Sequence, residues 1–282
     1  MSDTWNRGVP DGDSAPSAEL RTDIPHPARM YDYYLGGKDN FPADRAAAAK
    51  VVELLPSAPA GSRANRRFLG RAVRFASELG IRQFLDIGTG IPASNNTHEV
   101  AQAVAPESRV VYVDNDPIVL AHARALLKGT PQGRTAYVDA DFRDPGSILN
   151  APQTKELLDL SQPVALLAVA LLHFFADGDH PLDLLGQFKA ELAPGSVLIL
   201  THGTGELMPP EIARSIEAVY TQSGLNITSR THDEVLRFFD GMELVEPGIV
   251  PVHEWRTDGH EDDRVMTREE VAGYAGVAIK RG

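Results

Sequence analysis

Short apolar runs alternate with helix-forming stretches from residue 82 to residue 202, and this alternation restricts the chain to very few folds. The runs lie at 82–87, 109–114, 134–141, 163–171 and 195–202, and the stretches typical of helices at 97–105, 117–128, 152–159 and 180–192. Strands that alternate with helices form βαβ crossovers, which place the strands parallel in one sheet covered on both faces. The run 163–171 is apolar throughout, as a central parallel strand must be.

Two segments precede the sheet. Residues 1–22 are rich in Asp, Ser, Pro and Gly, so we expect a disordered tail that buries too little apolar surface to offset ordering entropy. Residues 23–80 are predicted to form three helices ahead of a sheet domain at 81–282. The residues expected at helix ends are Pro27 and Pro42 in first turns, Ser62 as an N-cap, and the pair 36–37 and Gly80 as stops.

The end of the chain has a different pattern. Helices are predicted at 209–223 and 231–238, followed by strands at 242–250 and 274–280. The two late strands have no predicted helix between them, which favours a hairpin with one strand antiparallel to the rest. The whole pattern therefore predicts an α/β fold with a mainly parallel seven-stranded sheet, an antiparallel last strand and an N-terminal helical segment.

Composition excludes several functional classes. The chain has no cysteine, so it has no disulfide framework, thiolate zinc site, iron–sulfur cluster or cysteine nucleophile. Acidic residues number 39 against 27 Lys and Arg, a net charge of −12, which argues against a nucleic-acid partner. The spacing of the nine histidines indicates no metal site.

Membrane and secretion signals are also missing from the pattern. The longest apolar run, Val164–Leu172, is far shorter than the roughly 20 residues of a membrane-spanning helix. The N-terminal residues contain no apolar core of the kind found in a secretory signal. We therefore expect a cytoplasmic protein with no membrane partner; its oligomeric state is not readable from the sequence.

Acidic residues stand where the predicted strands end. Asp86 precedes the Gly88-Thr89-Gly90 turn, Asp114 ends the second strand, and Asp141 follows the third. Ligands of parallel α/β sheets bind outside the carboxyl ends of the strands. This acidic rim suits a ligand that carries hydroxyl and amino groups and a positive charge, such as S-adenosylmethionine.

Each strand end is assigned a part of that ligand. Asp114 would accept from the two ribose hydroxyls, Asp141 from the adenine amino group, and Asp86 would interact with the methionine ammonium, while the N–H of Phe142 would meet a ring nitrogen. The glycines allow a sharp turn and a close approach to the ligand. The candidate cofactor residues at strand ends are Asp86, Gly88, Thr89, Gly90, Asp114, Asn115, Asp141, Phe142 and Ala170.

A dinucleotide site is the main alternative. The segment 88–93 matches Gly-x-Gly-x-x-Ala, which also occurs in nicotinamide-binding proteins. Two acids oppose it, because Asp86 would stand next to a pyrophosphate and Asp141 repeats an acid that a dinucleotide does not require. An NAD-dependent oxidoreductase therefore remains a second hypothesis, and a non-catalytic S-adenosylmethionine-binding protein a third.

The motifs themselves resemble a known family. FLDIGTG, VVYVDND, DADFRDP, ALLHFF and LAPGSVLIL resemble the successive motifs of class I S-adenosylmethionine-dependent methyltransferases. RMYDYYLGGKDNFPADR, NRRFLGRAVRF, QFLDIGTGIPASNNTHEVA and VVYVDNDPIVLAHARALL are similar to an actinobacterial S-adenosyl methyltransferase family long catalogued as a domain of unknown function. The resemblance covers roughly residues 24–282. It implies the Rossmann-like methyltransferase fold, S-adenosylmethionine as cofactor and S-adenosylhomocysteine as product, and it names no substrate.

The N-terminal segment is expected to fold over the cofactor as a lid. The strand ends leave the methionine carboxylate without a cationic partner, so another element must supply one. Tyr33 and Lys38, from the helix and polar glycine loop near residue 36, and Arg66, from the third helix, are the candidates.

The acceptor is expected to be a small molecule that is methylated on oxygen or nitrogen. Methyl transfer from a sulfonium mainly needs alignment of the reacting groups. A hydroxyl acceptor would call for a general base, and His173 and His202, which follow the fourth and fifth strands, are the candidates.

Overall fold

The computed structural model describes residues 21–126 and 129–282, so nearly all of the predicted tail at 1–22 lies outside the described residues. Within them, one sheet has the strand order β3-β2-β1-β4-β5-β8-β6, with β7 also paired to β8. The strands are β1 Gln83–Ile87, β2 Arg109–Asp114, β3 Arg134–Asp139, β4 Ala165–Val169, β5 Val197–Gly203, β6 Glu243–Leu244, β7 Val250–Pro251 and β8 Gly273–Ile279.

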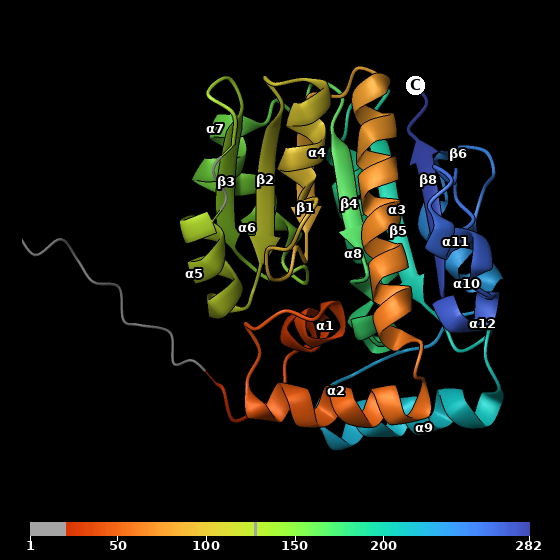
Figure 1. Ribbon diagram of the computed structural model, residues 1–282. Helices are drawn as coiled ribbons and strands as arrows, with labels where there is room; N and C mark the ends of the chain where they lie inside the picture. Colours follow the sequence, from red (N-terminus) through yellow and green to blue (C-terminus); the bar gives the residue numbers. More distant parts are fainter. Residues whose placement is uncertain (1–20, 127–128) are drawn as a thin grey trace, which may run out of the picture.

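The first five strands are parallel, as the alternating pattern predicted. Their carboxyl ends therefore meet at one edge, which is the lower edge in Figure 1. β8 runs antiparallel between β5 and β6, so the mainly parallel sheet with an antiparallel last strand is confirmed.

The prediction of one continuous strand at 242–250 was wrong. This segment consists of two short strands, β6 and β7, which pair with different parts of β8. Pro247 has no N–H to donate, and Gly248 adopts φ 83°, so the ladder cannot continue between them. The connection from β7 to β8 was also predicted without a helix, but it contains α11 Glu261–Val265 and α12 Arg268–Val271, which are each one turn long and too short for a periodic signal.

Helices cover both faces of the sheet (Figure 1). α3 and α4 pack on one face and α6, α7 and α8 on the other. Successive side chains of β1 point to opposite faces of the sheet, so Phe84 packs in one core and Leu85 in the other. The helices are α1 Pro27–Leu35, α2 Pro42–Leu54, α3 Ala58–Glu78, α4 Thr97–Val104, α5 Pro117–Leu126, α6 Pro145–Asn150, α7 Pro152–Leu157, α8 Pro181–Glu191, α9 Pro210–Gln222 and α10 His232–Leu236, with 3₁₀ turns η1 Leu172–Phe174, η2 Asp177–Asp179 and η3 Arg237–Phe239.

The three N-terminal helices were predicted, with one error at a helix start. Pro27 and Pro42 lie in first turns, and Gly36 ends α1 with φ 80°. Ser62 does not cap α3, which begins after Ser57 because Pro59 already occupies its first turn. The Ser62 hydroxyl instead donates to the Ala58 carbonyl one turn back, 2.9 Å away.

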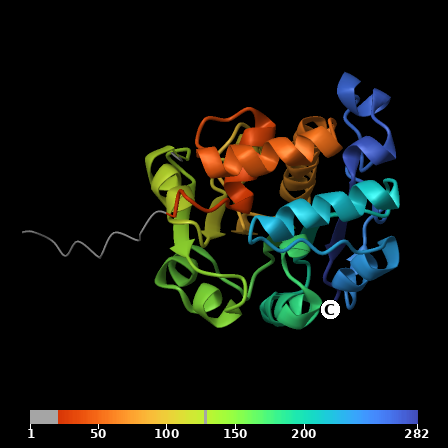
Figure 2. The same ribbon diagram turned by 90° about the horizontal axis from the view of Figure 1, so that it is seen from below.

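Three helices form a separate layer across the carboxyl ends of the strands. α1 lies directly below the strand ends, and α2 and α9 lie side by side beneath it (Figures 1 and 2). Their common core contains Met30, Tyr34, Ala47, Ala48, Val51, Ile216 and Tyr220. This cap layer thus joins the N-terminal segment to a helix that follows β5 more than 150 residues later. No helix in the described ranges is both long and apolar enough to cross a membrane.

Candidate functional site

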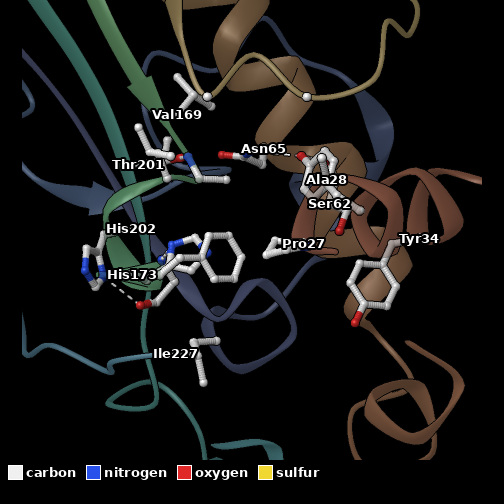
Figure 3. Close-up of a pocket in the computed structure, with 18 of the residues that line it drawn as sticks. Pro27, Ala28, Tyr34, Ser62, Asn65, Val169, His173, Thr201, His202 and Ile227 are labelled. Carbon is white, nitrogen blue, oxygen red and sulfur yellow. Dashed lines mark hydrogen bonds between the residues drawn. The ribbon is translucent and has the colours of Figure 1, made fainter. Parts of the chain in front are cut away.

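A cavity of about 470 Å³ lies between the carboxyl ends of the strands and the cap layer. Figure 3 shows side chains of α1, α3, β4 and β5 around it, with His173 from the loop after β4 and Ile227 from the loop after α9. The structure brings most of the predicted site residues to its wall: Arg66, Asp86, Gly88, Thr89, Gly90, Asp114, Asn115, Asp141, Phe142, Ala170, His173 and His202. Tyr33 and Lys38 are not among the lining residues; Tyr33 packs against Tyr34 and Lys38 is exposed.

The glycine turn after β1 forms the roof of this cavity. Gly88 and Gly90 adopt φ 70° and 67°, which L side chains rarely adopt. A Cβ on Gly88 would lie 2.5 Å from Leu171 Cδ1, whereas a Cβ on Gly90 would meet only Ala28 of α1, at 4.0 Å. The turn therefore needs both glycines for its shape, and α1 crosses directly in front of Gly90.

Asp114 is almost fully buried at the end of β2. One carboxylate oxygen accepts from Gly90 N at 2.8 Å and the other from Asp116 N at 2.9 Å. Burial raises the pKa of Asp114 to about 6, partly offset by these backbone donors. Each oxygen keeps one lone pair, so the carboxylate is still able to accept two further hydrogen bonds.

Asp86 is the second buried acid. Thr97 Oγ1 donates to Asp86 Oδ2 at 2.6 Å, and burial raises the pKa of Asp86 to about 6. An acid held this way gains from a cation placed against its other oxygen, because the cation offsets the cost of burying the charge.

Asp141 is held in place from both sides. Asn115 Nδ2 donates to one carboxylate oxygen and Arg143 N to the other, both at 2.8 Å. The Phe142 ring is buried and stacked on Phe188, with 5.5 Å between ring centroids, so the ring is part of the hydrophobic core. Asp141 and the Phe142 backbone thereby form a firm edge beside the cavity.

Arg66 of α3 supplies a cation to the cavity wall beside the loop that follows β1. Its Nη2 donates to the carbonyls of Ser94 and Asn95, at 2.9 and 3.1 Å. Its Nε is buried and has no hydrogen-bond partner among the described residues. A guanidinium fixed at one end with a donor left over suits a carboxylate.

His173 and His202 are neutral and engaged in hydrogen bonds. Gly203 N donates to His173 Nδ1 at 3.1 Å, so the ring proton of His173 lies on Nε2. Arg230 Nη1 donates to His202 Nε2 at 3.1 Å, so His202 Nδ1 carries its proton and donates to the Gly203 carbonyl at 2.7 Å. Burial lowers the pKa of His202 to about 3 and that of His173 well below its usual value, and the positive Arg230 lowers both further.

The rest of the cavity wall is apolar and comes from the cap layer and its neighbours. It is formed by Tyr34, Val51, Leu55, Phe174, Met208, Ile216, Tyr220, Leu225 and Ile227. Ala170, at the end of β4, lies between this wall and the acidic strand ends. It adopts φ 55°, and its N–H donates to Thr201 Oγ1 at 2.8 Å. Left-handed backbone at a non-glycine residue is concentrated at functional sites.

Sequence reasoning missed several residues at this site. Asn65 and Arg230 were not singled out, and the position of α9 in the wall was not expected. Asn65 is the first residue of NRRFLGRAVRF, which was used only to identify a resemblance. Arg230 has no local signal, because its partners come from the loop after β4 and from the end of β5.

The residues present fit S-adenosylmethionine. Asp114 and Asp141 offer acceptors, as a ribose diol and an adenine amino group require, and Asp86 and Arg66 offer opposite charges, as an amino-acid zwitterion requires. The same buried acids would repel a pyrophosphate. Within the described residues no cluster of His, Asp and Glu is arranged as a metal site.

Comparisons with known proteins agree with this fit. The family model described as S-adenosyl methyltransferase matches residues 13–281. A DUF574 family protein from Streptomyces avermitilis MA-4680 is 49% identical over 93% of this chain and 100% of its own, with a TM-score of 0.90. A Thermobifida fusca YX protein, named a candidate methyltransferase, is 40% identical over 96% of this chain and 100% of its own, with a TM-score of 0.85.

A more distant structure shows the fold alone. The plantazolicin methyltransferase BamL, solved in complex with a triazolic desmethylPZN analogue and S-adenosylhomocysteine, is 9% identical over 90% of this chain and 96% of its own, with a TM-score of 0.52. No curated protein matches the sequence.

Proposed function

The chain belongs to the S-adenosyl methyltransferase family, and from that premise we propose that it methylates an oxygen or nitrogen atom of a small molecule with an apolar body. The enzyme is an S-adenosylmethionine-dependent methyltransferase, with S-adenosylhomocysteine as product, so the nicotinamide and non-catalytic alternatives are set aside. The observation that carries the proposal is the division of one cavity of about 470 Å³ into a polar strand-end half and an apolar cap half. Cavities of roughly this size bind small ligands.

The polar half is the proposed cofactor subsite. Asp114 accepts from the ribose hydroxyls, Asp141 from the adenine amino group, and Phe142 N–H donates to the adenine ring. Gly88, Thr89 and Gly90 provide the close backbone approach, with Asn115 and Ala170 completing the wall. Asp86 offsets the ammonium charge. Arg66 binds the carboxylate, and it is the best placed of the three candidates because Tyr33 and Lys38 are not among the lining residues.

The apolar half is the proposed acceptor subsite. When bound, the cofactor supplies an activated methyl group on a sulfonium. The chain's own task is to exclude water and align the acceptor, which the half-buried Phe174 and the buried Ile216 and Tyr220 favour. Residues 23–80 contribute the lid through α1 and α2, with α9 beside them, and 81–282 form the methyltransferase domain.

The histidines favour an acceptor that needs no strong base. The accepting nitrogens of His173 and His202 already receive Gly203 N–H and Arg230 Nη1. We therefore assign both rings a positioning role, with His173 Nε2–H as a donor toward the acceptor. A neutral amine, or a hydroxyl acidic enough to ionise in water, fits such a site.

Calorimetry tests the cofactor subsite. S-adenosylhomocysteine should bind the wild type, NAD⁺ should not, and Asp114→Asn should weaken S-adenosylhomocysteine binding. Arg66→Met should weaken S-adenosylhomocysteine but leave its decarboxylated analogue unchanged. An equal loss of affinity for both nucleosides would mean that Arg66 does not bind the carboxylate.

A labelling experiment tests the acceptor class. The enzyme is incubated with methyl-labelled S-adenosylmethionine and a cell extract separated into small-molecule, protein and nucleic-acid fractions. Label should appear in the small-molecule fraction, in compounds that partition into organic solvent. Label found only in protein or nucleic acid would contradict the proposal.

A further inference from the structure

Asn65 presents a single unused acceptor to the cavity. It lies on α3, lines the cavity and is only 8% exposed. Its Nδ2 donates to Tyr31 Oη at 2.9 Å, and Tyr31 Oη in turn donates to the Ser62 carbonyl at 3.0 Å. This chain of donors fixes the amide orientation, so Oδ1 is the end that remains. Figure 3 shows the oxygen of Asn65 turned toward the ends of β4 and β5, where Val169 and Thr201 are labelled.

No donor from the described residues makes a hydrogen bond to Asn65 Oδ1. A buried amide oxygen that loses water without gaining a donor carries a free-energy cost. A ligand that fills this part of the cavity must therefore bring an N–H or O–H to Oδ1, or bind more weakly.

The neighbouring residues indicate which donor this is. Asp86, an acid with one oxygen occupied by Thr97, lines the same cavity. Arg66, the next residue on α3, offers a buried Nε without a partner. A neutral acceptor, a carboxylate and a guanidinium together complement a zwitterion, whose ammonium group has three N–H donors and whose carboxylate has only acceptors.

We infer that Asn65 Oδ1 accepts a hydrogen bond from the α-ammonium group of the bound cofactor, with Tyr31 as the positioning residue that aims it. The inference rests on the proposed cofactor subsite. It also gives α1 a second role, because Tyr31 belongs to the same helix as Met30 and Tyr34, which build the core of the cap layer. Tyr31 thereby connects α1 to the amino-acid end of the cofactor through Asn65.

The test compares ligands that differ only at the amino-acid end. Calorimetry is run with S-adenosylhomocysteine, its des-amino analogue and 5′-methylthioadenosine on wild type, Asn65→Leu and Tyr31→Phe. Hydrogen bonds to charged groups are worth enough that Asn65→Leu should lose about tenfold to hundredfold in affinity for S-adenosylhomocysteine. Its affinity for the other two nucleosides should stay within about twofold of wild type. Tyr31→Phe should show the same selectivity with a smaller loss.

Gln83→Leu is the matched control. Gln83 is a buried amide, 7% exposed, that bonds the Asp159 backbone and is not among the cavity-lining residues. Its loss should lower stability without changing any of the three affinities.

Each other outcome overturns the inference. Equal loss of all three ligands by Asn65→Leu would mean a structural role only, and no loss would mean that Asn65 does not touch the cofactor. A wild type that binds neither S-adenosylhomocysteine nor 5′-methylthioadenosine would overturn the cofactor subsite itself, which separates that failure from one of Asn65.

Discussion

Arg29 Nε of α1 lies 3.3 Å from Asp116 Oδ2, and both side chains are 5% exposed. The pair joins the lid helix to the loop after β2, where Asp116 N–H also donates to Asp114. Asp44 of α2 lies 3.6 Å from the same Arg29 Nε, and His26 Nδ1 lies 3.2 Å from Asp116 Oδ2. The contacts are ionic rather than well-aligned hydrogen bonds, since Arg29 Nε has no partner at hydrogen-bond angles. These contacts join α1 to the loop that holds Asp114, the acid that we propose binds the ribose.

Replacing Arg29 should damage stability and cofactor binding together. Arg29→Met leaves Asp44 and Asp116 buried without their cation, which costs about 3–5 kcal/mol. Urea unfolding should report that loss, and calorimetry a weaker affinity for S-adenosylhomocysteine because Asp114 loses its support. Arg134→Gln, which breaks an exposed pair with Glu156, should cost at most about 1 kcal/mol. Similar losses of stability and affinity in the two variants would show that Arg29 does not hold α1 against the loop after β2.

Low pH should weaken cofactor binding but stabilise the folded state, and both effects come from Asp86 and Asp114. The pKa values of Asp86 and Asp114 are raised from 3.8 to about 6 by burial. The native state therefore holds more protons than the unfolded one between pH 4 and 6. The contribution of these acids to stability is fully present below the unfolded pKa of 3.8 and is lost as the pH rises through about 6.

Cofactor affinity should follow the opposite course, because the ammonium and hydroxyl donors need ionised carboxylates. Between pH 7.5 and 5 the affinity for S-adenosylhomocysteine should fall by about tenfold per acid. Calorimetry across this range measures it, and Asp114→Asn should show a shallower dependence than wild type. An affinity that rises toward pH 5 would refute the assignment.

The two histidines should show opposite tautomers and no titration near neutrality. Nitrogen-15 spectra of the imidazole rings should place the proton on Nε2 in His173 and on Nδ1 in His202, as Gly203 N–H and Arg230 require. Both rings should stay neutral from pH 8 to pH 5, because burial and Arg230 lower their pKa values. A titration midpoint between pH 6 and 7 for either ring would make that histidine a general-base candidate again.

The two glycines of the turn should differ in their tolerance of alanine. Gly90→Ala meets only Ala28 at 4.0 Å, so it should cost about the 1–2 kcal/mol of a left-handed alanine. Gly88→Ala also places a methyl 2.5 Å from Leu171 Cδ1 and should cost about 1–3 kcal/mol more. Urea midpoints of the two variants measure the difference, and equal losses would show that Leu171 moves aside freely.

Predictions from the sequence succeeded where the signal was local. The parallel strands follow from continuous apolar runs, and α1 and α2 from prolines that suit a first helical turn. Ser62 was misjudged as a cap because Pro59 sets the start of α3, and 242–250 was misjudged as one strand because Pro247 and Gly248 interrupt it. In both cases a backbone restriction outweighed the side-chain pattern.

The strand-end residues of the candidate site could also be found, since a parallel sheet brings all carboxyl ends to one edge. Asn65 and Arg230 could not, because their environment consists of residues far away in the chain. The same is true of the Arg29–Asp116 pair, 87 residues apart.

By itself, the sequence of this protein determined the sheet, its covered faces and the acids at its edge, because the periodicity of apolar residues and the residue at each strand end are properties of neighbouring residues. Only the tertiary structure decided that α9 joins α1 and α2 in one cap, that Tyr33 and Lys38 stay outside the cavity lining, and that both histidines have their accepting nitrogens occupied. These outcomes depend on which distant side chains share a buried space, where each donor must find its acceptor.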